Sequence, residues 1–272
     1  MLLPTQLAFC SSASMMDLGQ LKDEGPVRSA PGFCFEHYDQ IGSTNTYGLQ
    51  KARDGHPGNL WVRSDIQVTG RGRRGREWTS ESGNLFASVL LRVDVQNEKI
   101  VQLPFVAALA LGEAIERATG AHNLAQLKWP NDVLIDGQKV SGILLESESG
   151  PNGELCLVCG FGVNVSHHPD LGDYAVTDLR SMGYMCDPSQ VFDALAQSFA
   201  RWLETWKAAS GFEEIRSAWL RRAVGRGKPI RVRLSNEEFS GVFIDIDQMG
   251  RLIVKMDHGG ERLVTAGDVF FS

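Results

Sequence analysis

Residues 67–78 read Gln67-Val68-Thr69-Gly70-Arg71-Gly72-Arg73-Arg74-Gly75-Arg76-Glu77-Trp78. Four arginines and three glycines fall within this stretch of a chain whose formal net charge is -6. Guanidinium groups bind carboxylate and phosphate oxygens through paired hydrogen bonds, and glycines with positive φ let a backbone approach a ligand closely. The stretch is too polar to join a core, and apolar segments flank it at 59–68 and 85–91. It therefore predicts a loop between two strands that faces an anionic partner.

On this stretch alone, a solvated loop or a nucleic-acid tether remains an open interpretation. The acidic net charge of the chain argues against general nucleic-acid binding, which needs a broad basic face. The positive charge at 71–76 is therefore local, as expected for a small anionic ligand. No lysine follows the last glycine of the run, so the loop is not a Walker-type phosphate loop.

Length and composition predict a globular protein with one large core, or with one core and a small satellite domain. The chain has 272 residues, of which 43% are hydrophobic. Its five cysteines are scattered and odd in number, so we expect no disulfide framework and a cytoplasmic location. Cys156 and Cys159 have the spacing of half a zinc site, but they lie in an apolar run without a second pair, which favours a buried strand. No apolar run approaches the roughly 20 residues of a membrane span.

The apolar pattern predicts an α+β fold, with a mixed, mostly antiparallel sheet packed with helices. The segment 85–91 is apolar on both faces and is expected to be a central strand. Further strands are expected at 125–135, 139–146 and 154–165, and helices at 103–119, about 188–210 and about 212–224. Short alternating segments follow Gly227 and predict a small β-barrel. The expected parts are a poorly ordered lead-in at 1–32, a large domain at 33–225 and the barrel at 226–272.

Three further motifs place polar groups where chemistry could use them. Ser43-Thr44-Asn45 precedes a helical segment; these side chains are expected to cap the helix, and facing a ligand at the positive helix end is a compatible alternative. Lys128-Trp129-Pro130-Asn131-Asp132 joins two strands at a proline, with Lys139 seven residues further on. Each lysine alone would be read as a solvated surface residue. Gly160 and Gly162 interrupt a bulky strand before Asn164, which suggests close approach of a ligand or backbone.

In this order, the four motifs make residues 33–272 resemble a biotin protein ligase. The arginine- and glycine-rich stretch combined with Lys128-Trp129-Pro130-Asn131-Asp132 is the most specific part of the resemblance. It implies a catalytic domain like those of class II synthetases, followed by a small SH3-like barrel. Larger relatives carry a helix-turn-helix domain at the N-terminus, for which 32 residues are too few, so transcriptional repression is not implied.

The resemblance implies two reactions, both of which need fixed positive charge. The carboxylate of biotin attacks the α-phosphorus of ATP, which gives biotinyl-5′-adenylate and pyrophosphate, and a lysine of a biotin carboxyl carrier domain then displaces AMP. Mg²⁺ is expected on the phosphates. The implied partner is the carrier protein of a biotin-dependent carboxylase, without nucleic acid or membrane, and a homodimer is compatible with the resemblance.

The resemblance also assigns roles to individual residues. The implied catalytic residues are Arg73, Lys128, Asp132 and Lys139, with Asp132 also near any metal. The implied ligand-binding residues are Ser43, Thr44, Asn45, Gln67, Gly70, Arg71, Gly72, Arg73, Arg76, Trp78, Asn131, Lys139, Gly142, Gly160, Gly162 and Asn164. Among these, Ser43, Thr44 and Gln67 would bind the ureido ring of biotin, and Arg71 and Lys139 its carboxylate. Arg73 would bridge the carboxylate and the α-phosphate, Asn131 and Asn164 would lie on the ATP side, and Trp78 near the adenine.

Two alternatives stay open at this point. A lipoate or octanoate ligase or transferase shares this kind of fold, although it is not expected to combine the arginine-rich loop with the Lys128 to Asp132 motif. A non-catalytic nucleic-acid module would use the arginines and the barrel, and the acidic balance of the chain opposes it. For the enzyme, we expect the loop at 70–76 to be mobile without ligand and to order over the adenylate.

Overall fold

The computed structural model describes residues 18–93, 98–172 and 174–271. Within them, one sheet has the strand order β1-β2-β3-β4-β8-β7-β6-β5. Its strands are β1 (Leu21–Pro26), β2 (Cys34–Ile41), β3 (Leu60–Gln67), β4 (Leu85–Val93), β5 (Gln126–Lys128), β6 (Asp132–Ile135), β7 (Gln138–Ser149) and β8 (Leu155–Val163). Strands β2 and β3 pair in parallel and the other neighbours are antiparallel, as expected for a mixed, mostly antiparallel sheet.

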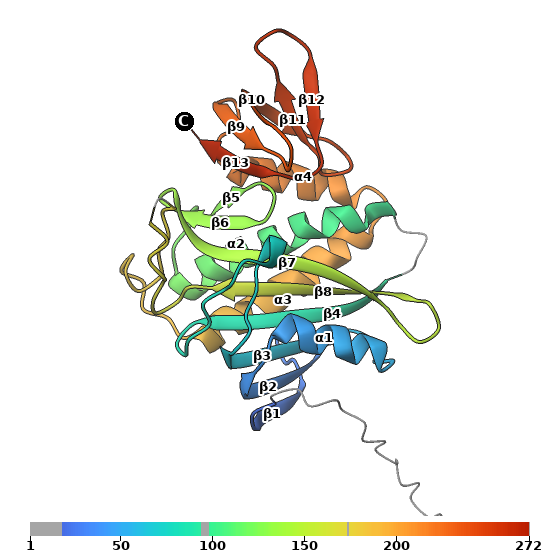
Figure 1. Ribbon diagram of the computed structural model, residues 1–272. Helices are drawn as coiled ribbons and strands as arrows, with labels where there is room; N and C mark the ends of the chain where they lie inside the picture. Colours follow the sequence, from blue (N-terminus) through green and yellow to red (C-terminus); the bar gives the residue numbers. More distant parts are fainter. Residues whose placement is uncertain (1–17, 94–97, 173, 272) are drawn as a thin grey trace, which may run out of the picture.

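Helices cover both faces of this sheet (Figure 1). They are α1 (Thr44–Arg53), α2 (Leu103–Thr119), α3 (Pro188–Lys207) and α4 (Gly211–Arg222), with short 3₁₀ turns η1 (Arg73–Gly75) and η2 (Glu98–Gln102). Side chains of a strand alternate between faces. Accordingly, Val89 of β4 joins the main core with α2 and α3, whereas the next residue, Leu90, joins a smaller cluster beneath α1. The prediction that 85–91 is a buried central strand is confirmed.

Local sequence signals explain where several elements begin and end. Helix α2 ends at Gly120, whose φ of 70° is left-handed and accessible to glycine without strain. Asp136 and Gly137 adopt positive φ and form the tight turn between β6 and β7. Asp187 caps α3, because its side chain accepts a hydrogen bond from the Ser189 amide at 2.7 Å.

A second, smaller sheet lies at one end of the molecule (Figure 1). This C-terminal sheet contains β9 (Pro229–Arg233), β10 (Glu238–Ile246), β11 (Leu252–Lys255), β12 (Glu261–Val264) and β13 (Asp268–Phe271), all antiparallel, in the order β12-β11-β10-β9-β13. Its β10–β11 turn contacts the part of the chain that carries the large sheet. The Trp129 indole donates to the Gly250 carbonyl at 3.1 Å, and Gln102 donates to the Gln248 carbonyl at 2.8 Å.

The structure differs from expectation in two places. Residues 21–26, expected within a poorly ordered lead-in, form β1, because their backbone pairs with β2 although five of the six residues are exposed. The segment 125–135, expected as a strand, is a hairpin of β5 and β6. The expectation that residues 128–132 join two strands at Pro130 is confirmed. Residues 1–17 lie outside the described residues. No helix in the described part of the chain is long and apolar enough to cross a membrane.

Candidate active site

One cavity of about 410 Å³ brings the motifs together. Its walls come from the start of α1, the loop after β3, the β5–β6 turn, β7, β8, the segment 164–176 and the C-terminal sheet. Every predicted site residue except Gly70 lines it: Ser43, Thr44, Asn45, Gln67, Arg71, Gly72, Arg73, Arg76, Trp78, Lys128, Asn131, Asp132, Lys139, Gly142, Gly160, Gly162 and Asn164. Residues separated by more than a hundred positions therefore face one space.

The arginine loop, defined here as residues 70–78, closes on itself. The Trp78 amide donates to the Gly70 carbonyl at 3.0 Å, and the Gly72 amide donates to the Arg76 carbonyl at 2.7 Å. The expectation of positive φ holds for Gly75 but not for Gly70 or Gly72. Gly70 is required for a different reason, since a Cβ there would lie 2.3 Å from the Ser80 hydroxyl and 2.5 Å from the Trp78 carbonyl oxygen. Gly70 thus shapes the base of the loop without lining the cavity.

Each arginine of the loop has an acceptor that directs it. Arg71 reaches Glu146 and Thr46, and Arg73 donates to the Asn131 side chain at 2.9 Å. Arg74 and Arg76 both pair with Asp268 of β13, at 2.9 and 3.2 Å. Burial lowers the pKa of Arg73, and the neighbouring carboxylates of Asp268 and Asp132 act against that shift.

A second group of cations gathers around Asp132. The Lys139 ammonium lies 2.7 Å from Asp132 Oδ1, because the tight β6–β7 hairpin brings the two strands into register. The Tyr174 hydroxyl donates to Asp132 Oδ2 at 2.9 Å and accepts a hydrogen bond from the Lys128 ammonium at 3.2 Å. Burial lowers the pKa of Lys128, an effect that Asp132 offsets and Lys139 reinforces. Burial and Asp132 raise the pKa of Tyr174, which keeps its phenol protonated.

The Trp78 indole packs against two glycines of the sheet. A Cβ at Gly162 would lie 2.5 Å from the indole Nε1, and a Cβ at Gly142 would lie 3.0 Å from Cζ3 of the same ring. A Cβ at Gly160 would meet the Asn45 side chain at 2.1 Å. The close approach expected at Gly160 and Gly162 is made by these two side chains, and approach of a ligand there stays a prediction. The Trp78 Nε1 is buried without a hydrogen-bond partner among the described residues.

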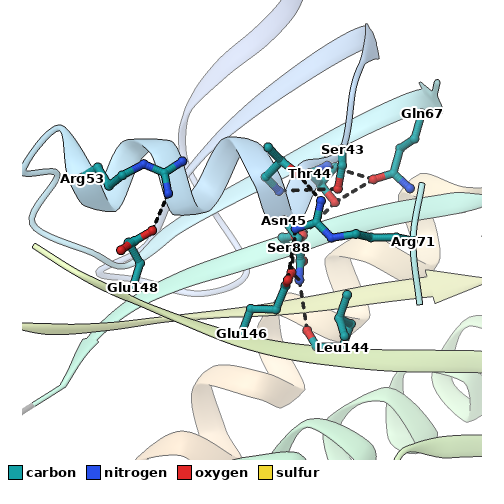
Figure 2. A network of polar contacts seen from close by, with 11 residues as sticks. Ser43, Thr44, Asn45, Arg53, Gln67, Arg71, Ser88, Leu144, Glu146 and Glu148 are labelled. Atoms are coloured by element: carbon teal, nitrogen blue, oxygen red, sulfur yellow. Dashed lines mark hydrogen bonds and ion pairs between the residues drawn. The ribbon is translucent and has the colours of Figure 1, made fainter. Parts of the chain in front are cut away.

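The start of α1 joins the cavity through a polar network (Figure 2). Ser43 caps the helix as expected, by accepting a hydrogen bond from the Thr46 amide at 3.4 Å. It also lines the cavity, and its contact with a ligand stays a prediction. The Thr44 amide donates to Gln67 Oε1 at 2.8 Å. The buried Ser88 hydroxyl lies 2.7 Å from Thr44 Oγ1 and 2.6 Å from Asn45 Oδ1.

The side chains that could bind Mg²⁺ or zinc can be compared with the predictions. No group of three or more His, Cys, Asp or Glu side chains suited to a metal occurs in the described ranges. Asp132 nevertheless provides a cavity carboxylate, and Mg²⁺ is commonly bound by one or two carboxylates together with substrate phosphates. The Cys156 and Cys159 side chains are free and buried in β8 in different core clusters, as expected for a strand and not for a zinc site.

Sequence reasoning missed several residues around the cavity. They are Glu146 beside Arg71, Tyr174 beside Asp132, and Arg233, Asp268 and Phe270 from the C-terminal sheet. The β13 residues follow a plain alternating pattern that marks them only as strand. Tyr174 lies in a segment without periodicity, so no sequence signal pointed to it.

Comparison with known proteins agrees with this arrangement. Residues 38–164 match the biotin/lipoate A/B protein ligase family, and residues 226–272 match the biotin protein ligase C-terminal domain. The chain is 41% identical to a biotin–[acetyl-CoA-carboxylase] ligase of Paracoccus denitrificans, over 84% of this chain and 97% of the relative. It is 31% identical to the ligase of the same name from Mycobacterium tuberculosis, over 85% of this chain and 86% of the relative.

The fold agrees as well. The biotin protein ligase of Aquifex aeolicus, solved in complex with biotin and ATP, superimposes with a TM-score of 0.75 and 25% identity, over 88% of this chain and 99% of that one. Both the sequence and the fold therefore lead to the same conclusion: the chain belongs to the biotin protein ligase family.

Proposed function

We propose that this protein activates biotin with ATP and transfers the biotinyl group to a lysine of a biotin carboxyl carrier domain. The observation that carries the proposal is the convergence of Arg71, Arg73, Lys128 and Lys139 on one cavity. Membership of the biotin protein ligase family supports it, and two relatives, 41% and 31% identical to this chain, are named biotin–[acetyl-CoA-carboxylase] ligases. These relatives favour biotin over lipoate as the acyl substrate.

The first reaction joins two anions. A carboxylate oxygen of biotin forms a bond to the α-phosphorus of ATP, and the bond from that phosphorus to the pyrophosphate oxygen breaks. In water the two substrates repel each other, so the site must supply fixed positive charge at the reacting atoms. A positioned donor of this kind typically contributes about 3 kcal/mol of transition-state stabilisation.

On the biotin side, we propose that Arg71 and Lys139 bind the carboxylate and that Ser43, Thr44 and Gln67 bind the ureido ring. Support comes from their common place on the cavity wall and from the hydrogen bonds that fix Thr44 to Gln67 at 2.8 Å. Rigid polar groups lose little entropy when a ligand binds. Asn45 and Gly160 pack against each other within this wall and are proposed to shape it.

On the ATP side, we propose that Arg73 bridges the carboxylate and the α-phosphate, with Lys128, Asn131 and Asn164 nearby. Burial of Arg73 and Lys128 supports this role, because charge is more effective where water is excluded. Gly72, Arg76, Trp78, Gly142 and Gly162 complete the proposed nucleotide wall. Asp132 would hold Mg²⁺, which when bound neutralises phosphate charge.

In the second reaction the carrier lysine forms an amide with biotin while AMP leaves. The amine attacks the acyl carbon of the mixed anhydride, so it must first lose the proton that it holds at its ordinary pKa of about 10.4. We propose Asp132 as the relay for this proton. Its carboxylate lies within hydrogen-bond distance of both Lys139 and Tyr174 inside the cavity, which supports the assignment.

The test is incubation of the protein with biotin, MgATP and a carrier domain, followed by mass measurement of the carrier. The expected result is a carrier heavier by one biotinyl group, with pyrophosphate and AMP released. A parallel incubation with lipoate in place of biotin should leave the carrier unchanged. An unmodified carrier in the biotin incubation, with an established ligase as positive control, would refute the proposal. The free cysteines support a cytoplasmic site of action.

A further inference from the structure

Glu146 lies outside the cavity wall and yet contacts one of its cations. It belongs to β7, and its two carboxylate oxygens lie 3.1 and 3.0 Å from Nη2 of Arg71. Arg71 lines the cavity, whereas Glu146 does not. Any influence of Glu146 on a ligand would therefore be exerted through Arg71.

The carboxylate of Glu146 is itself fixed by buried groups (Figure 2). Asn45 donates to Glu146 Oε2 at 2.8 Å and to the Leu144 carbonyl at 3.2 Å. The same Asn45 side chain lies 2.6 Å from the hydroxyl of Ser88, which is fully buried in β4. A typical surface ion pair contributes little because two mobile side chains must be ordered. Here the Glu146 carboxylate is already held by hydrogen bonds to Asn45, which in turn contacts the buried Ser88, so its ion pair with Arg71 orders fewer mobile groups.

Arg71 is consequently held from two sides. Glu146 binds Nη2, and Thr46 of α1 accepts a hydrogen bond from Nη1. Among the described residues the structure gives no partner for Nε, so a donor remains for an anionic ligand in the cavity. An arginine fixed in this way has already lost the rotamer freedom that ligand binding would otherwise remove.

We propose that Glu146 is a positioning residue that holds the Arg71 guanidinium in its ligand-binding orientation. The inference rests on the proposed function, since it assigns Arg71 to the biotin carboxylate. A negative charge beside Arg71 could instead compete with an anionic ligand. The two roles predict opposite changes in biotin affinity when the charge of Glu146 is removed.

The strand offers a matched control. Glu148 lies two residues further along β7, on the same face, and pairs with Arg53 at the far end of α1 (Figure 2). Glu146→Gln and Glu148→Gln therefore remove the same charge from the same strand. Only the first removes an ion pair to a cavity residue, so only the first is expected to affect biotin.

The experiment measures biotin-dependent pyrophosphate release and, independently, calorimetric binding of biotin without ATP. For Glu146→Gln we expect KM and Kd for biotin to rise about tenfold or more, the effect of losing a hydrogen bond to a charged group, with kcat changed far less. Glu148→Gln should match the wild type. In an Arg71→Ala background, Glu146→Gln should cause no additional rise, because its effect passes through Arg71.

Unchanged or tighter biotin binding by Glu146→Gln would overturn the inference, as would an equal effect in the Arg71→Ala background. Should Glu146→Gln fail to fold, Thr46→Val can be tested instead, because it removes the other contact to the Arg71 guanidinium. This variant is also expected to raise KM for biotin. An unchanged KM would refute the inference. A wild type that binds biotin but releases no pyrophosphate would refute the proposed function alone. Calorimetry would still decide the role of Glu146 in that case.

Discussion

Replacing Gly162 by alanine is expected to disturb the arginine loop through a single contact. The added Cβ would lie 2.5 Å from Nε1 and from Cε2 of Trp78, whereas carbon atoms in ordinary contact are about 3.5 Å apart. The backbone at Gly162 cannot move away, because β8 is paired on both sides, with Phe86 of β4 and with Gly142 of β7. The indole must therefore retreat by roughly 1 Å.

Movement of the indole reaches the reacting groups. The Trp78 amide closes the arginine loop by donating to the Gly70 carbonyl at 3.0 Å, and the loop carries Arg71 and Arg73. Overpacking of this kind costs about 1–3 kcal/mol of unfolding free energy. A misplacement of about 1 Å among groups that position substrates can reduce the rate on the order of 10²-fold.

The assays are urea unfolding and biotin-dependent pyrophosphate release. Removing the Trp78 indole should reverse the sign of the stability change caused by Gly162→Ala. In a Trp78→Ala background, Gly162→Ala is expected to stabilise the protein by about 0.5–1 kcal/mol, since alanine is less costly than glycine within a strand. If Gly162→Ala alone kept wild-type stability and activity, the indole would not be held against β8 as described. An equal loss of stability in both backgrounds would refute the same reasoning.

Three further predictions concern other parts of the molecule. Lys139→Ala should lower biotin-dependent pyrophosphate release by about 10²–10³-fold, because a cation at the biotin carboxylate is lost and Asp132 loses its ion pair. A wild-type rate would contradict the assignment of Lys139 to the biotin carboxylate. Asp268→Asn should speed limited proteolysis within residues 71–76, since Arg74 and Arg76 lose their shared anchor, and biotin with ATP should slow cleavage in the wild type; equal cleavage in all samples would argue against an anchored loop. Asp187→Ala should cost about 1 kcal/mol of unfolding free energy at pH 7. The Ser189 amide lowers the pKa of Asp187, so this contribution is present above the ordinary carboxyl pKa and is lost as pH falls through the folded-state pKa. Urea unfolding at pH 7 and at pH 3 should show that the difference in unfolding free energy between variant and wild type is smaller at pH 3. An equal difference at both pH values would contradict the prediction.

Much of the fold was predictable because its signals are local. The apolar stripe before Gly120, the Asp136-Gly137 turn and the doubly apolar segment at 85–91 each specify one element by periodicity or by backbone preference. Strand β1 was missed because five of its six residues are exposed, so it lacks an apolar pattern. Its pairing with β2 depends on backbone N–H and C=O groups, which nearly every residue carries, so residue type gives no signal for it.

The candidate site was predictable where residue type reveals chemistry. Arginines, lysines and interior glycines at unusual positions indicated the cavity, and the family resemblance ordered them. Glu146 and Tyr174 were not found, because their importance comes from neighbours distant in the sequence, Arg71 and Asp132. The glycines show the same limit: Gly160 and Gly162 were correctly read as points of close approach, but only the structure identifies Asn45 and Trp78 as the groups that approach.

The wall that Asp268, Phe270 and Arg233 contribute to the cavity has a consequence for the growing polypeptide. Strands β1 to β8 and their helices all precede the C-terminal sheet in the chain, and domains generally fold in the order in which a ribosome releases them. A nascent molecule in which only these preceding elements had folded would thus expose an open-sided pocket, with Arg74 and Arg76 lacking their anchor. Translation of β13 would complete the enclosure, so the ability to retain a reactive adenylate would arise late in synthesis, after most of the protein is already folded.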